Sequence, residues 1–197
     1  MTDEAAWDHI IVGGRSAGCT LTRRLAESGR RVLLVEAGPD TPPGAVPATV
    51  LDSYPGVAYF DPRLHWQALR VTLGSGNAKR EPRRYEQARL MGGGSSINGM
   101  FALRGLTADY DEWARLDEWV CAMAYGGWHA SGTCRMGASG DPGAVVDEAC
   151  RVRGHRGLCV VDASVMPSIP RANTNLPTIM VAEKISAAIL AEDVPAE

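Results

Sequence analysis

The residues best suited to chemistry lie in three glycine-rich stretches of this 197-residue chain. The first stretch, Gly13–Gly18, follows a short apolar run and opens a segment with helical spacing of apolar residues. Such a turn places free backbone N–H groups and the positive end of a helix dipole where they can bind a pyrophosphate. Glu36 comes 18 residues after Gly18, at the end of a second apolar run. A carboxylate at that position accepts hydrogen bonds from a ribose diol, so the pattern indicates a dinucleotide site.

Arg15 departs from this pattern, because it occupies the middle glycine position of G-x-G-x-x-G read from Gly13. The middle glycine lets the backbone approach the pyrophosphate without a Cβ in between. The Arg15 side chain could swing outward and pair with a phosphate, or it could block the cofactor. The fingerprint alone therefore leaves open an ordinary βαβ unit with a glycine-rich turn.

The second stretch is Gly92-Gly93-Gly94, followed by Ser95 and Ser96. Three glycines allow the backbone to come close to a ligand, and a serine can cap a helix that we expect to begin near residue 97. This pattern is similar to a second anion cradle. On spacing alone, a glycine-rich loop before a capped helix is favoured.

The third stretch, residues 126–137, contains His129. Imidazole titrates near neutral pH and serves as a general base in many enzymes. A histidine beside a tryptophan is nevertheless more often a packed or hydrogen-bonded structural group. The sequence around His129 leaves both interpretations open.

These stretches are positioned by elements that the apolar periodicity predicts. We expect strands over residues 9–12, 31–35, 66–73, 144–147 and 158–161, and helices over residues 16–27, 107–116 and 177–190. The apolar face of the last helix is most simply explained by core packing.

The composition suits a globular protein and argues against several classes. Hydrophobic residues make up 45% of the chain and the net charge is −3, which gives no indication of binding to nucleic acid or acidic membranes. We find no signal segment and no apolar run long enough to span a bilayer. The five cysteines have no metal-site or redox-motif spacing, so we predict no metal site and reduced thiols in a cytoplasmic protein.

Six segments occur together in one order: DHIIVGGRSAGCTLTRRL, RVLLVEAG, ARLMGGGSSINGMFALRG, WHASGTCRMG, AVVD and GLCVVDASVMPSIPRANTNLPTIMVAEKI. In this combination the chain resembles the glucose-methanol-choline (GMC) oxidoreductases. The segments YEQARLMGGGSSIN and WHASGT favour the branch of hydroxymethylfurfural oxidases and choline-dehydrogenase-like alcohol oxidases.

The resemblance implies an α/β fold: a Rossmann-like FAD-binding domain with a small parallel sheet flanked by helices. Residues 1–116 match the N-terminal part of this domain, and residues 117–197 match its C-terminal part with the catalytic loop. Between these parts the family carries further strands and a substrate-binding domain, so the resemblance implies a large internal deletion with the substrate-binding domain largely missing. We expect the strand at 158–161 to lie beside the strand at 9–12.

The resemblance also implies FAD as the cofactor and assigns its contacts. The expected cofactor-binding residues are Gly13, Gly14, Ser16 and Ala17 at the pyrophosphate, Glu36 at the ribose, Gly92, Gly93, Ser95 and Asn98 in the second cradle, and Asp162 and Ala163 farther along the cofactor. The expected catalytic residues are His129 as the base and Asn175 as its partner.

The implied reaction is oxidation of a small-molecule alcohol by hydride transfer to the flavin, with oxygen or another acceptor taking the electrons. A second hypothesis is a catalytically impaired remnant that acts only as a flavin-binding or interaction module. A third and weaker one is a nicotinamide-dependent reductase, which the segments GGGSSIN and WHASGT argue against. The deletion further predicts exposed apolar surface through which the chain could form a homo-oligomer.

Overall fold

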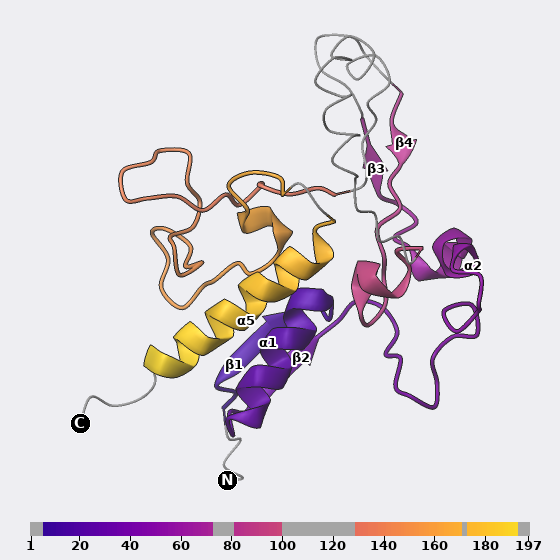
Figure 1. The fold of residues 1–197 in the computed structure, drawn as a ribbon, viewed down its shortest axis with the longest axis horizontal. Helices are drawn as coiled ribbons and strands as arrows, with labels where there is room; N and C mark the ends of the chain where they lie inside the picture. Colours follow the sequence, from indigo (N-terminus) through magenta and orange to yellow (C-terminus); the bar gives the residue numbers. More distant parts are fainter. Residues whose placement is uncertain (1–5, 73–80, 100–128, 171–172, 193–197) are drawn as a thin grey trace, which may run out of the picture.

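A computed structural model describes residues 6–72, 81–99, 129–170 and 173–192 (Figure 1). At its N-terminal end, strand β1 (His9–Val12), helix α1 (Ser16–Glu27) and strand β2 (Val32–Val35) form a βαβ unit. The two strands are parallel, with His9 opposite Val32 and Val12 opposite Val35. The small parallel sheet is thus confirmed, and in the described residues it has two strands.

The residues of α1 explain its position on the sheet. Ala17, Leu21 and Leu25 recur every four residues, so they lie on one face of the helix, and all three are buried. Side chains alternate along β1, so Ile11 packs against the buried cluster around α1.

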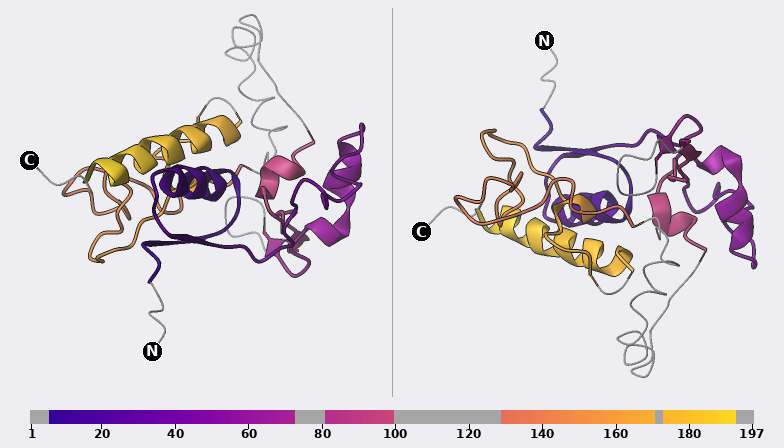
Figure 2. Two further views of the ribbon diagram at one scale, coloured as in Figure 1. Left: turned by 90° about the horizontal axis from the view of Figure 1, so that it is seen from below. Right: turned by 90° about the horizontal axis from the view of Figure 1, so that it is seen from above.

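Helix α5 (Asn175–Glu192) packs against α1, which Figure 2 shows lying between α5 and the two strands. The two helices run in the same direction, because Asn175 contacts Ser16 at one end and Glu183 contacts Arg24 farther along. Ala182 is fully buried in this interface. The predicted last helix is confirmed, with two more residues at each end.

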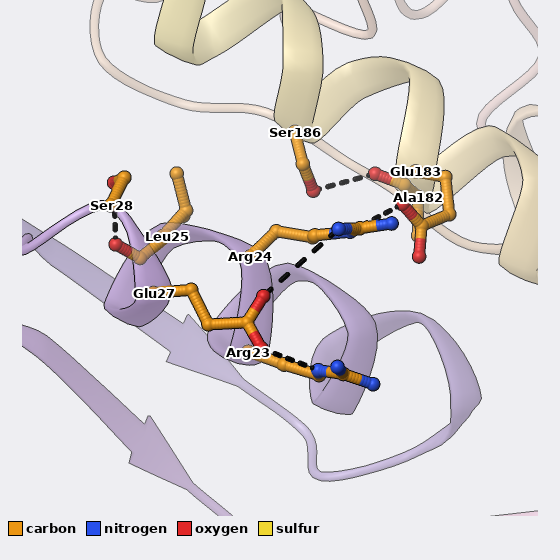
Figure 3. A network of polar contacts seen from close by, with 8 residues as sticks. All are labelled: Arg23, Arg24, Leu25, Glu27, Ser28, Ala182, Glu183 and Ser186. Atoms are coloured by element: carbon orange, nitrogen blue, oxygen red, sulfur yellow. Dashed lines mark hydrogen bonds and ion pairs between the residues drawn. The ribbon is translucent and has the colours of Figure 1, made fainter.

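Polar contacts line the exposed side of this helix pair (Figure 3). Arg24 Nε lies 2.6 Å from Glu183 Oε2, and Arg23 Nε lies 2.8 Å from Glu27 Oε1. All four side chains are at least 40% exposed, so these ion pairs contribute little to stability. The apolar cluster between the helices therefore carries the packing.

The expectation of a late strand beside β1 was wrong. Residues 158–161 form no strand with β1, because their backbone groups bond to the preceding segment: Val152 N donates to Leu158 O and Val160 N donates to Cys150 O. The segment still lies close to β1, since Val161 packs against the same buried cluster as Ile11. Val161 also packs against a second buried cluster, which is formed by Val146, Cys150, Val165 and Ile185.

The elements between β2 and residue 99 pack around a core of their own. They are helix α2 (Gly56–Phe60), the 3-10 helix η1 (Pro62–Leu64), strands β3 (Arg70–Val71) and β4 (Arg83–Arg84), and the 3-10 helix η2 (Gly93–Ser96). The buried residues are Ala58, Leu64, Ala88, Leu90 and Ile97. The strand predicted over residues 66–73 is reduced to β3, and the helix predicted over residues 107–116 lies outside the described residues.

The face of the sheet that points away from α1 is bare in the described part of the chain. Ile10 is 62% exposed, Val12 83% and Val35 44%. The sequence predicted an exposed apolar surface, and association through this face stays a prediction. No helix within the described ranges is both long enough and apolar enough to cross a membrane.

Candidate functional site

The first glycine turn is held tightly against the start of α1. A Cβ built on Gly18 would lie 1.9 Å from the carbonyl oxygen of Gly13, so only glycine allows this approach. Cys19 N donates to Arg15 O at 2.8 Å, which is the first hydrogen bond of the helix. The N–H groups of Ser16, Ala17 and Gly18 precede that bond and have no intrahelical partner. The first turn also carries no acidic side chain, so the helix N-terminus suits an anion.

Glu36 is fixed by the backbone of the same turn. Gly14 N donates to its Oε2 at 2.7 Å, and Gly38 N donates to its Oε1 at 2.9 Å. Each carboxylate oxygen keeps a further lone pair after accepting one bond. The predicted ribose contact at Glu36 therefore stays a prediction, with the acceptor placed beside the glycine turn.

Arg15 directs its guanidinium away from the glycine turn. Its Nη1 donates to Gln87 Oε1 at 2.9 Å and its Nη2 donates to Ala88 O at 3.3 Å. Its side chain crosses Gly93, where an added Cβ would lie 2.4 Å from Arg15 Cγ. Arg15 thus links the first glycine turn to the segment that leads into the second.

The second glycine stretch lies directly beside the first. Gly92 N donates to Gly14 O at 2.7 Å. Gly92 and Gly93 have φ angles of +87° and +59°, in the left-handed region that glycine adopts at little cost. The two cradles predicted from sequence are therefore one continuous backbone surface.

The expectation that Ser95 or Ser96 caps a helix beginning near residue 97 was wrong. Both serines lie inside the 3-10 helix η2. Ser95 Oγ donates to Gly92 O at 2.6 Å, and Ser96 Oγ donates to Met91 O at 3.1 Å. The hydroxyls therefore stabilise the glycine loop itself, and Asn98 follows on the exposed surface.

The loop that carries His129 is attached to the segment of Asp162 and Ala163. Gly132 N donates to Ala163 O at 3.2 Å. Asp162 caps the 3-10 helix η3 (Ala163–Val165), because its Oδ1 accepts from Ser164 N at 2.8 Å. These contacts bring the predicted cofactor residues 162 and 163 next to the predicted catalytic loop in space.

His129 reaches the N-terminal end of α5. Its Nδ1 lies 3.0 Å from the hydroxyl Oγ1 of Thr174. The next residue, Asn175, donates from Nδ2 to Ser16 Oγ at 2.8 Å. The structure therefore connects the two predicted catalytic residues through Thr174 and ties both to the start of α1. Sequence reasoning missed Thr174, although its position directly before Asn175 was a usable signal.

One thiol lies within this arrangement. Cys19 Sγ donates to Gly14 O at 3.1 Å. Burial raises the pKa of this thiol above its ordinary value, so it stays protonated near neutral pH. Cys19 therefore acts as a hydrogen-bond donor that supports the glycine turn. Within the described ranges, no group of three or more His, Cys, Asp or Glu side chains could hold a metal ion.

Comparison with known proteins gives one family. Residues 87–182 match the family model of the GMC oxidoreductases. The chain is 56% identical over 129 residues to 5-(hydroxymethyl)furfural oxidase of a Methylovorus species, covering 60% of this chain and 24% of that one. It is 53% identical over 77 residues to oxygen-dependent choline dehydrogenase of Vibrio vulnificus, covering 39% and 14%. The chain thus spans about a quarter or less of these relatives.

Among solved structures, formate oxidase of Aspergillus oryzae aligns with a TM-score of 0.41 and 31% identity. The alignment covers 54% of this chain and 18% of that one.

Proposed function

Because residues 87–182 belong to the GMC oxidoreductase family, we propose that this chain binds FAD and oxidises the CH–OH group of an alcohol. The observation that carries the proposal is the convergence of His129, Thr174 and Asn175 on the glycine turn at Ser16. The proposed alcohol oxidation uses a base for the hydroxyl proton and a backbone cradle for the cofactor, and here the two come from segments far apart in the sequence.

The residues at the start of α1 fit the cofactor. The N–H groups of Ser16 and Ala17 have no partner within the helix, and with no acidic side chain in the first turn they would hold the pyrophosphate. Glu36 would accept the ribose hydroxyls from its fixed position beside Gly14. Gly92 and Gly93 would extend this backbone surface toward the rest of the cofactor.

FAD would supply the hydride acceptor for this oxidation. His129 would take the proton of the substrate hydroxyl at its imidazole. Asn175 gives one N–H to Ser16, which leaves its second N–H and its carbonyl oxygen to orient the substrate oxygen. Such orientation supplies up to roughly 7–11 kcal/mol of the barrier in well-positioned systems.

We further infer that residues 1–116 and 117–197 are two parts of a single flavin-binding domain. The support is the contact between α1 from the first part and α5 from the second, with Leu21 and Ala182 in one buried cluster. The substrate-binding domain of the family would be largely missing. The bare sheet face around Val12 favours the second candidate, a flavin-binding or interaction module that does not turn over.

The decisive test is the visible absorption spectrum of the purified chain before and after addition of FAD. Yellow protein that releases FAD on denaturation supports the proposal, whereas a folded, colourless chain that takes up no FAD overturns it. In the FAD-loaded protein, His129→Ala should abolish anaerobic bleaching of the flavin by an alcohol and leave its flavin content intact. His155→Ala is the matched control, because His155 is exposed and its Nδ1 lies 3.3 Å from Arg153 O, away from this site.

A further inference from the structure

The contact between His129 and Thr174 carries an inference beyond the proposed function. We propose that Thr174 is a positioning residue that accepts a hydrogen bond from Nδ1–H of His129 and so leaves Nε2 free as the proton acceptor. The two atoms are 3.0 Å apart, which is a normal hydrogen-bond length. The direction of this bond rests on the proposed role of His129 as the base.

The Thr174 hydroxyl is available for this contact because of the residues that follow it. Thr178 N donates to Thr174 O at 3.0 Å, which places Thr174 at the N-cap of α5. A threonine at an N-cap usually accepts a hydrogen bond from the N–H two or three residues later. Three residues later stands Pro177, which has no N–H. One of the two usual capping partners is therefore missing, and the hydroxyl bonds to the imidazole.

The chemistry of imidazole fixes what this bond does. A neutral imidazole has one N–H donor and one acceptor nitrogen, and the partner of one nitrogen decides the state of the other. With Nδ1–H donating to Thr174 Oγ1, the lone pair lies on Nε2, where it can accept the proton of an alcohol. With the opposite tautomer, Nε2 carries a hydrogen and His129 cannot act as a base through that atom.

The next residue gives this bond a fixed place in the molecule. Asn175 Nδ2 donates to Ser16 Oγ at 2.8 Å, so the first turn of α5 is tied to the first turn of α1. This contact places Thr174 close to the glycine turn. The Thr174-Asn175 pair thus orients the base and locates it relative to the cofactor cradle at the same time.

The test is ¹⁵N NMR of the histidine side chains in the intact chain, recorded at alkaline pH, where free imidazole is neutral. The His129 signals are identified by their absence in His129→Ala. We expect the Nδ1–H tautomer at His129 in the wild type, the same tautomer in Thr174→Ser, and a shift toward Nε2–H in Thr174→Val. Thr178→Val is the matched control, because it makes the same change one turn farther along α5 and should leave the tautomer unchanged.

An Nε2–H tautomer in the wild type overturns the proposal, and so does an unchanged tautomer in Thr174→Val. Unchanged signals of the other histidines show that a variant keeps its fold. Should Thr174→Val fail to fold, the wild type and Thr174→Ser still decide the question.

A kinetic measurement separates this inference from the proposed function. In FAD-loaded protein, Thr174→Val should slow alcohol-driven bleaching at least about tenfold, as part of the 10²–10⁴-fold that a positioned base supplies, while Thr174→Ser restores the rate. Unchanged bleaching in Thr174→Val counts against the positioning role. Unchanged bleaching in His129→Ala instead refutes the base assignment itself, whatever the tautomer.

Discussion

Gly18→Ala tests the geometry of the first glycine turn most directly. The added Cβ would lie 1.9 Å from Gly13 O and 3.4 Å from Ile11 Cγ2. The first contact is with backbone and cannot be relieved by rotating a side chain. The start of α1 must therefore move away from β1, which opens the turn that we propose holds the pyrophosphate.

The expected loss in the free energy of unfolding of Gly18→Ala follows from two opposing effects. Forcing an extra methyl group into a packed site costs up to about 3 kcal/mol. Alanine is favoured over glycine inside a helix by about 1 kcal/mol, which offsets part of this cost. The net loss in the free energy of unfolding is about 2 kcal/mol, which lowers the Tm of a chain of this size by about 4–8 °C. FAD affinity should fall as well, because the free N–H groups at Ser16 and Ala17 are displaced.

Thermal unfolding followed by circular dichroism measures the first effect, and quenching of FAD fluorescence on titration measures the second. Gly44→Ala is the control, because no atom lies within 4 Å of its added Cβ and its stability should change by no more than about 0.5 kcal/mol. A Tm for Gly18→Ala equal to or above the wild-type value, with unchanged FAD affinity, would refute the close approach of Gly13 and Gly18.

Three further predictions follow from other parts of the molecule. Arg15→Gly should weaken FAD binding in equilibrium dialysis, because it removes the bonds to Gln87 and Ala88 that link the two glycine stretches; unchanged binding would contradict this, and tighter binding would reveal an obstruction. The Arg63 guanidinium holds the pKa of Asp61 well below its usual range, so its contribution to stability is present above the ordinary carboxyl pKa and is lost as pH falls toward the depressed value. Urea unfolding of Asp61→Asn should therefore depend less on acid pH than that of the wild type, and an equal dependence would contradict this. Val12→Asp should reduce self-association in sedimentation velocity, because Val12 is 83% exposed on the bare sheet face; identical profiles, or a wild type that is monomeric at all concentrations, would contradict it.

The βαβ unit could be predicted from the sequence because its signals are local. The apolar run of β1 stops at Gly13, and the buried residues of α1 recur every four positions from Ala17 to Leu25. Both elements have the predicted bounds, since neighbouring residues determine where a strand ends and a helix begins.

The late strand could not be predicted because strand pairing is not local. Residues 158–161 have the apolar composition of a buried strand, whereas the preceding segment around Val152 carries Arg151 and Arg153 and gave no such signal. The short turn between the two segments lets Val152 bond to Leu158 before either reaches β1. Periodicity identifies a segment that needs partners, and it does not choose between a near partner and a distant one.

The candidate site likewise contains residues that local sequence patterns reveal and residues that only the folded structure reveals. The glycine turn and Glu36 were visible as a motif with a known spacing, whereas Thr174 belongs to no motif. Its contact with His129 joins residues 45 positions apart and becomes visible only in space. The role of Arg15 was hidden for a similar reason, because its partners Gln87 and Ala88 lie more than 70 residues away in the sequence.

The geometry of the site depends more on helix packing than on the polar contacts that define it. A hydrogen bond such as that from Asn175 to Ser16 has a net worth of about 1 kcal/mol, and the Arg24–Glu183 pair is exposed. Neither could hold two helices in a fixed register by itself. Ala17 and Ala182 are both buried between α1 and α5, and their small side chains let the two backbones approach closely. That approach is what brings Asn175 within reach of Ser16, and with it Thr174 and His129. The placement of the base is therefore set by apolar packing that extends from Ala17, next to Ser16, to Ala182, about two helical turns beyond Asn175.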